Sequence, residues 1–92
     1  MVTCLVLMTV ERGSINDVAG KLIEIDGVSE VFSVAGQYDL VALIRVKNNE
    51  AVADVVTDGM RKIEGIKTSE TLIAFKVFSQ HDLESMFSVG LD

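Results

Sequence analysis

The middle of the chain reads Val34-Ala35-Gly36-Gln37-Tyr38-Asp39-Leu40, a stretch that joins two apolar runs. Gly36 can adopt the positive φ that a tight connection between antiparallel strands needs. Asp39 places a carboxylate at the mouth of an otherwise apolar strand. We therefore expect a β-hairpin here, and it is our first candidate for a small-molecule site. A hairpin in which Asp39 only stabilises its own turn is an equally good reading of the pattern.

Side chains alternate along both arms of this hairpin, which predicts strands over residues 28–35 and 38–47. The first of these carries Glu30 within its apolar set, as an edge strand tolerates. The second is apolar on both faces in its middle, and so is a further predicted strand over residues 2–10, which indicates that these two strands are central. In the strand over residues 28–35 we expect Val28, Phe32 and Val34 on one face and Ser29, Val31, Ser33 and Ala35 on the other.

Two helices are predicted between these strands from a period of about 3.6 residues. The first begins after Ser14, with Asp17 as its capping-box partner, and ends at Asp26-Gly27. The second is capped by Asn48-Asn49 and ends near residues 63–66. Gly59 lies on its apolar stripe, where it would let the helix approach the sheet closely. The expected stripes are Ile15, Val18, Ala19, Leu22 and either Ile23 or Ile25 in the first helix, and Val52, Val55, Val56, Gly59 and Ile63 in the second.

Residues 22–28 and 60–66 share the pattern Ile-acid-Gly-aliphatic, and each follows a strand and a helix. The chain therefore consists of two βαβ units joined by the central hairpin. Right-handed crossovers then predict an α+β, ferredoxin-like βαββαβ sandwich with antiparallel strand order 4-1-3-2 and both helices on one face. The other face would expose four large apolar side chains, so we expect a dimer built by facing sheets. These side chains are Leu5, Leu7, Val41 and Leu43, or those of the other parity.

The last predicted strand runs from residue 68 to residue 78, and Ser79 followed by Asp82 indicates a short final helix. We accordingly expect a ferredoxin-like domain over residues 1–78 and a C-terminal helix and tail over residues 79–92. The only histidine, His81, falls in the first turn of that helix and is expected to be solvated.

The composition narrows the functional classes. The net charge of −6, from 14 acidic and 8 basic residues, argues against direct binding to nucleic acid. The first residues contain neither a signal peptide nor a span long enough for a membrane, so we expect a cytoplasmic protein. Cys4 lies in an apolar run and is expected to be a packed side chain. The sequence contains no metal-ligand cluster, phosphate loop or nucleophile motif, so we expect no cofactor, no metal and no catalysis.

Two short motifs carry a resemblance to a known family. Gly36-Gln37-Tyr38-Asp39 is similar to the Gly-x-aromatic-Asp hairpin of the ligand-binding domain of Lrp/AsnC transcription regulators, and Ser69-Glu70-Thr71 is similar to its Thr-x-Thr. With the order of elements, the resemblance covers residues 1–78. By itself, a pair of hydroxyls at period two is ordinary in an edge strand. The resemblance implies an amino-acid effector, held between subunits, and dimers that assemble into octamers or similar rings. The implied ligand-binding residues are Gly36, Gln37, Tyr38, Asp39, Ser69 and Thr71.

The resemblance lacks one part of the family pattern. Family members usually carry an N-terminal helix-turn-helix, whereas the first predicted strand here begins at Val2. We therefore expect a stand-alone sensing module without direct DNA binding, which acts through its own assembly or by co-assembly with a full-length regulator. Two alternatives stay open: a small enzyme of the dimeric α+β barrel type that uses the sheet cavity, and a purely structural oligomerisation unit.

Overall fold

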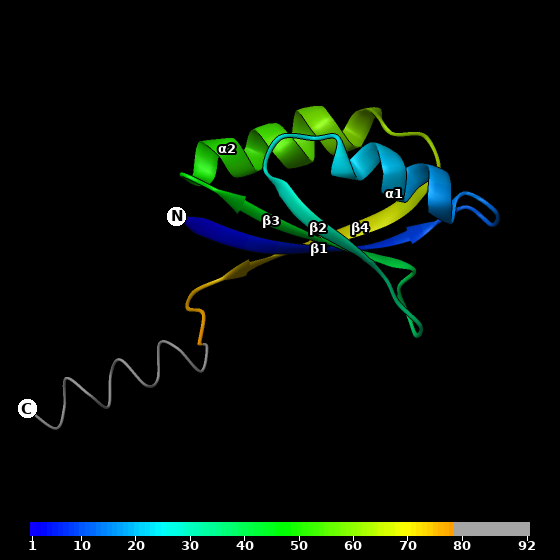
Figure 1. Ribbon diagram of the computed structural model, residues 1–92, viewed down its shortest axis with the longest axis horizontal. Helices are drawn as coiled ribbons and strands as arrows, with labels where there is room; N and C mark the ends of the chain where they lie inside the picture. The colour runs from blue at the N-terminus through cyan, green and yellow to red at the C-terminus, as the bar shows by residue number, and fades with distance from the viewer. Residues whose placement is uncertain (79–92) are drawn as a thin grey trace, which may run out of the picture.

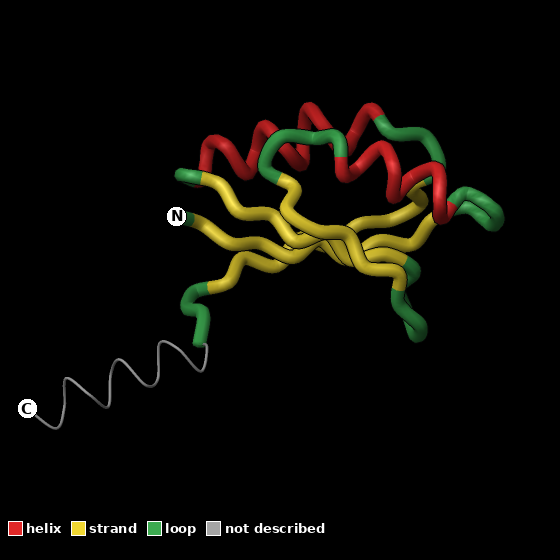
Figure 2. The backbone as a smooth tube through the Cα atoms, viewed as in Figure 1, coloured by secondary structure: helices red, strands yellow, loops and turns green. Residues whose placement is uncertain are grey.

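Four antiparallel strands form one sheet, and both helical segments lie on the same face of it (Figure 1, Figure 2). The computed structural model describes residues 1–78. The strand order β2-β3-β1-β4 confirms the predicted ferredoxin-like topology, with β1 and β3 central. The elements are β1 (Val2–Val10), α1 (Ile15–Ile23), β2 (Val28–Ser33), β3 (Leu40–Val46), α2 (Asn49–Ala53), the π-helical turn η1 (Asp54–Gly59), the 3₁₀ turn η2 (Met60–Lys62) and β4 (Ile66–Ala74).

The core lies between the sheet and the helices. Alternate residues of the two central strands face the helices, as the period of two in their sequences predicts. Val18 and Leu22 of α1 pack against them from the helix layer. Burying a side chain of this size contributes roughly 1.5–3 kcal/mol, so these strands anchor the fold. The fully buried residues of the sheet are Cys4, Val6, Met8, Leu40, Ala42 and Ile44.

A β-bulge near the start of β2 reverses part of the predicted strand pattern. Val28 pairs with Ile44, whereas Glu30 pairs with Leu43 and Val31 with Ala42. The register therefore shifts by one residue between Val28 and Glu30, and Val28 shares the helix-facing side with Val31. The prediction that Val28 and Phe32 share a face is wrong, because Phe32 pairs with Val41 on the open face.

The two helix starts differ in their capping. The predicted side-chain cap at Ser14 is absent, and Asp17 instead forms an ion pair of 3.2 Å with Lys21 one turn later. The predicted cap of the second helix is confirmed, because the Asn48 side chain accepts a hydrogen bond of 2.8 Å from the backbone N–H of Ala51. Only the second helix therefore begins with its first free amides partly satisfied by a side chain.

A change of helix type moves the apolar stripe of the second helix. After α2 the chain passes through η1 and η2, and this π turn inserts an extra residue into the helical period. Met60 is consequently buried, although it lies outside the predicted stripe. A side chain at Gly59 would meet Ile25 at 3.0 Å. The prediction that Gly59 lets the helix approach the sheet is therefore wrong, since its close neighbour is the connection between α1 and β2.

The glycine of the repeated Ile-acid-Gly-aliphatic motif has nearly the same positive φ in both halves of the domain. Gly27 and Gly65 have φ values of +100° and +103°, and each ends the turn that leads from a helical segment into a strand. This region of φ favours glycine. The strands end earlier than predicted, β2 at Ser33 and β4 at Ala74. The predicted final helix and His81 lie outside the described residues.

Candidate functional site

Asp39 is held by hydrogen bonds to both neighbouring strands. Its backbone N–H donates to the carbonyl of Met8 at 2.8 Å, and its own carbonyl accepts from the N–H of Val34 at 3.0 Å. Its carboxylate accepts a hydrogen bond of 2.9 Å from the N–H of Val10. Asp39 therefore ties the hairpin to the end of β1, and one carboxylate oxygen is engaged within the chain. The carboxylate thus contacts β1, whereas the turn-stabilising reading expected it to contact its own turn.

Tyr38 links the hairpin to β4. Its hydroxyl donates a hydrogen bond of 2.5 Å to the carboxylate of Glu70. Glu70 pairs with Leu7 of β1, so Tyr38 reaches across β1 on the open face of the sheet. The hydrogen bond to Glu70 raises the pKa of the Tyr38 phenol, and loss of hydration and the negative charge of Glu70 raise it further. Glu70 was not among the predicted site residues, since it is the unspecified middle position of Ser-x-Thr.

The other predicted residues lie on β4 and at the tip of the hairpin. Ser69 pairs with Met8 and Thr71 with Val6, and the side chains of both partners point to the helix layer. The hydroxyls of Ser69 and Thr71 therefore lie on the helix-facing side of the edge strand β4. Gly36 has a φ of +128°, as predicted for the turn, and it is exposed together with Gln37. In one chain, Tyr38 thus reaches the open face of the sheet, whereas the Ser-x-Thr hydroxyls lie on the helix-facing side.

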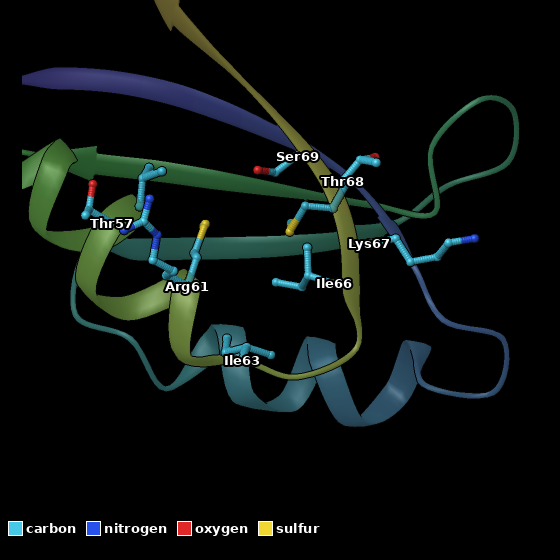
Figure 3. A pocket seen from close by; sticks show the side chains of 10 residues that line it. Thr57, Arg61, Ile63, Ile66, Lys67, Thr68 and Ser69 are labelled. Carbon is cyan, nitrogen blue, oxygen red and sulfur yellow. The ribbon is translucent and has the colours of Figure 1, made fainter.

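A pocket of about 320 Å³ lies between the end of the second helical segment and the start of β4 (Figure 3). Among the predicted residues only Ser69 lines it. In the close view, Thr57 and Arg61 approach from the helical side and Ser69 from the strand, while the Lys67 side chain points away from the helix (Figure 3). The lining consists of Met8, Val56, Thr57, Met60, Arg61, Ile63, Ile66, Lys67, Thr68 and Ser69.

The lining of this pocket is apolar at its base and positively charged at its rim. Met8 and Met60 are buried, whereas Arg61, Lys67 and the hydroxyl residues are exposed. No carboxylate is among the lining residues. Arg61 and Thr57 escaped the sequence analysis because they carry no motif, and the π turn that turns this face of the helix toward β4 has no clear sequence signal. A second hollow, of about 370 Å³, lies beside the start of α2, and none of the predicted ligand-binding residues lines it.

Other kinds of site have little support within residues 1–78. This part of the chain contains no group of three or more His, Cys, Asp or Glu side chains arranged to hold a metal ion. Cys4 is buried, and burial raises the pKa of its thiol, which disfavours the nucleophilic thiolate form. No helix in the described part of the chain is long and apolar enough to cross a membrane.

Comparison with known proteins agrees with the fold. The model of the Lrp/AsnC ligand binding domain matches residues 3–83. The transcriptional regulator FL11 of Pyrococcus furiosus is 35% identical over 75 residues, which make up 82% of this chain and 49% of that protein. The chain thus spans about half the length of the curated relatives it matches.

Solved structures give the same result. TTHA0845 from Thermus thermophilus has a TM-score of 0.81 and 40% identity, and the match covers 87% of this chain and all of that one. A feast or famine regulatory protein of M. tuberculosis, solved with L-methionine, has a TM-score of 0.72 over 87% of this chain and 54% of that one. Its identity of 23% supports a shared fold alone. This protein belongs to the Lrp/AsnC family, and its residues 3–83 form the ligand-binding domain of that family.

Proposed function

We propose that this domain is a non-catalytic sensor of a small amino acid, which it binds in the pocket between the second helical segment and β4. The observation that carries the proposal is the position of Ser69, which belongs to the Ser-x-Thr motif and lines this pocket. The pocket volume of about 320 Å³ lies at the lower end of the range of roughly 300–1,000 Å³ found for small-molecule sites. A ligand of amino-acid size suits a pocket of these dimensions.

The hairpin residues enter the proposal through a second copy of the chain. Gly36 and Gln37 are exposed at the tip of the hairpin, and the pocket lies beside the edge strand β4. We propose that the hairpin of a neighbouring copy closes the pocket, with backbone amides and the second Asp39 oxygen contacting the charged groups of the ligand. In this arrangement Gly36, Gln37, Tyr38 and Asp39 act from one subunit, and Ser69 and Thr71 act from another. The L-methionine complex of the M. tuberculosis relative supports an amino acid as the class of ligand.

The open face of the sheet supports a dimer as the building block. On this face Leu5 of β1 lies opposite Leu43 of β3, and Leu7 lies opposite Val41. All four side chains are partly exposed. Leu72 extends the apolar area at one edge and is 44% exposed. Such side chains contribute roughly 1.5–3 kcal/mol each when they are buried, which favours pairing of two sheets. Further assembly of these dimers into an octamer or a similar ring would bring hairpins and pockets of different dimers together.

The proposed output is a change of assembly. Ligand held between subunits stabilises the assembled state by mass action. The module would act alone or by co-assembly with a full-length regulator, without touching DNA itself. A cytoplasmic location is part of this proposal, because the named relatives are transcriptional regulators.

The enzyme alternative would need acid, base or nucleophilic groups in a cavity on the open face of the sheet. The centre of that face carries leucine and valine side chains, and Glu70 at its edge is engaged by Tyr38. These observations favour the sensor over the enzyme of the dimeric α+β barrel type. A purely structural oligomer would assemble in the same way but independently of ligand.

A thermal-shift screen against the twenty amino acids, followed by sedimentation velocity with any hit, tests the proposal. We expect at least one amino acid to raise the melting temperature and to shift the assembly state. A ligand-insensitive melting temperature and a ligand-insensitive ring would overturn it and favour the structural unit. Turnover of a bound compound would favour the enzyme.

A further inference from the structure

We infer that the pocket beside β4 selects an amino acid with an uncharged, apolar side chain, and that Arg61 binds its α-carboxylate. This inference rests on the proposed function and adds the class of ligand and a specificity-determining residue. Arg61 belongs to neither of the two sequence motifs. It enters the pocket lining from η2, on the side opposite Ser69 (Figure 3).

The base of the pocket defines the side chain that it accepts. Met8 is fully buried beneath it and Met60 is 5% exposed, and Val56, Ile63 and Ile66 add partly buried aliphatic surface. Methionine side chains are flexible and polarisable, so they adapt to apolar groups of different shape. A charged or amide side chain placed against this base would lose hydration without gaining a partner. An aliphatic or thioether side chain instead gains from burial there.

The rim of the pocket defines the charged group that it accepts. Arg61 is exposed and forms no ion pair with any residue of the described chain. A guanidinium can hold a carboxylate through two parallel hydrogen bonds. Thr57 lies one helical turn before Arg61, and the hydroxyl of Ser69 approaches from β4, so both can donate to the same carboxylate (Figure 3). Lys67 also lines the pocket, but its side chain points away from the helix (Figure 3).

The charge of the lining excludes one class of amino acid in particular. Arg61 and Lys67 are its charged residues, and it contains no carboxylate. A lysine or arginine ligand would bring a second positive charge close to these groups without a counter-ion from the same subunit. An aspartate or glutamate ligand would have to bury its second carboxylate against the methionine base. The pocket therefore favours a zwitterion with an apolar side chain over either charged class.

Calorimetric titration of the intact chain with L-methionine, L-leucine, L-lysine and L-glutamate tests the selectivity. We expect methionine or leucine to bind at least about tenfold more tightly than lysine and glutamate. Placing an unpaired charge in an apolar site costs more free energy than a tenfold change in the dissociation constant represents. Tighter binding of lysine or glutamate would overturn this inference and leave the sensor proposal standing. If the thermal-shift screen finds no amino acid that binds, the sensor proposal fails as well, so the two failures are distinguishable.

Two changes test the role of Arg61. The variant Arg61→Gln removes the guanidinium. An amine that lacks the α-carboxylate, but otherwise equals methionine or leucine, whichever binds, removes the group that Arg61 would contact. The amino acid should bind Arg61→Gln roughly tenfold to a hundredfold more weakly than it binds the wild-type chain. The amine should bind the wild-type chain more weakly than the amino acid does, by a similar factor. If Arg61 contacts the carboxylate, the amine should bind the variant and the wild-type chain about equally. If the amine instead binds Arg61→Gln more weakly than it binds the wild-type chain, by the same factor as the amino acid does, the two losses are additive. This result would contradict the contact, even though Arg61→Gln weakens binding.

Arg12→Gln serves as the matched control, because it removes an exposed arginine outside the pocket lining and should leave the affinity close to that of the wild-type chain. Lys67→Gln tests whether the other cation of the lining holds the carboxylate instead. We expect it to lose less affinity than Arg61→Gln, because the Lys67 side chain points away from the helix (Figure 3). Circular dichroism of every variant checks that the domain is folded, since Arg61 is exposed and its loss should not unfold the chain. A loss of affinity in Lys67→Gln as large as that in Arg61→Gln would reassign the carboxylate contact and overturn the role of Arg61.

Discussion

The carboxylate of Asp39 accepts a hydrogen bond from the backbone N–H of Val10 at 2.9 Å. The pairing of β1 with β4 shifts its register between Thr9 and Val10, so this contact satisfies a backbone donor at an irregular point of the sheet. The central hairpin is thereby attached to the end of the first strand, although 29 residues separate the two in sequence. Asp39 is therefore a structural residue as well as a proposed ligand-binding residue.

Replacing Asp39 with alanine should destabilise the domain without unfolding it. The change leaves the N–H of Val10 without its acceptor, which costs roughly 1–3 kcal/mol for a buried or partly buried donor. Asp39→Asn keeps an acceptor oxygen and should cost less. Urea denaturation of the three proteins measures the difference. Equal stability of Asp39→Ala and the wild-type chain would show that the contact is not formed in solution.

The phenol of Tyr38 should titrate above the ordinary value of 10.0. Tyr38 is the only tyrosine, so the phenolate absorbance reports this group alone. Because the folded-state pKa is raised, the stabilisation from this contact is present below the unfolded pKa and is lost as the pH rises through the folded value. Glu70→Gln should move the midpoint down toward 10.0, because it removes the negative charge beside the phenol. An unchanged midpoint in Glu70→Gln would contradict the contact.

The glycines of the repeated motif should not tolerate a side chain. Gly27 has a φ of +100°, and a Cβ there would meet Val46 and Val55 at 2.8 and 2.9 Å. Backbone strain and overpacking together predict a loss of roughly 2–5 kcal/mol for Gly27→Ala. Gly65→Ala should cost somewhat less, since its nearest contact is Val18 at 3.0 Å.

A third glycine supplies the control for these two. Gly20 lies within α1, is exposed, and has no atom within 4 Å of an added Cβ. Gly20→Ala should therefore stabilise the domain by roughly 0.5–1 kcal/mol through better helix propensity. Thermal and urea denaturation should show a lower free energy of unfolding for Gly27→Ala and Gly65→Ala, and a higher one for Gly20→Ala, than for the wild-type chain. A neutral Gly27→Ala would contradict the described turn.

The open face should lose its ability to pair when a charge is placed at its centre. Leu7→Glu would bury two carboxylates per dimer, at a penalty of several kcal/mol per ion. We expect the dimer dissociation constant to rise by roughly a hundredfold or more in sedimentation equilibrium. Ile23→Glu is the matched control, because Ile23 is 49% exposed on α1 in the helix layer. An unaffected dimer in Leu7→Glu would move the interface away from this face.

The sequence predicted the topology because its strongest signals are periodic and repeated. The middles of β1 and β3 are apolar on both faces, which placed these strands at the centre, and the Ile-acid-Gly motif identified two βαβ units. The structure confirms both predictions. The errors arose where one extra residue changed a period, at the bulge between Val28 and Glu30 and at the π turn before Met60. Such insertions depend on tertiary packing and leave little trace in local composition.

The candidate site was less predictable than the fold. The turn at Gly36 was predicted from the positive φ that glycine can adopt, whereas the helix-facing side of Ser69 became clear only from its pairing with Met8. The partnership of Tyr38 with Glu70 joins residues 32 positions apart, and the approach of Arg61 depends on the helical turn that precedes it. Both require the three-dimensional arrangement of the side chains, which a residue pattern does not contain.

An amide NMR titration of the intact chain, with the amino acid that gives the largest thermal shift, tests the proposed site most directly. We expect the strongest chemical-shift changes in the helical residues 56–61 and in β4 residues 66–69, with further changes at the hairpin residues 36–39 of the neighbouring copy. Shifts confined to the hollow beside the start of α2, or the absence of saturable shifts, would contradict the proposed site.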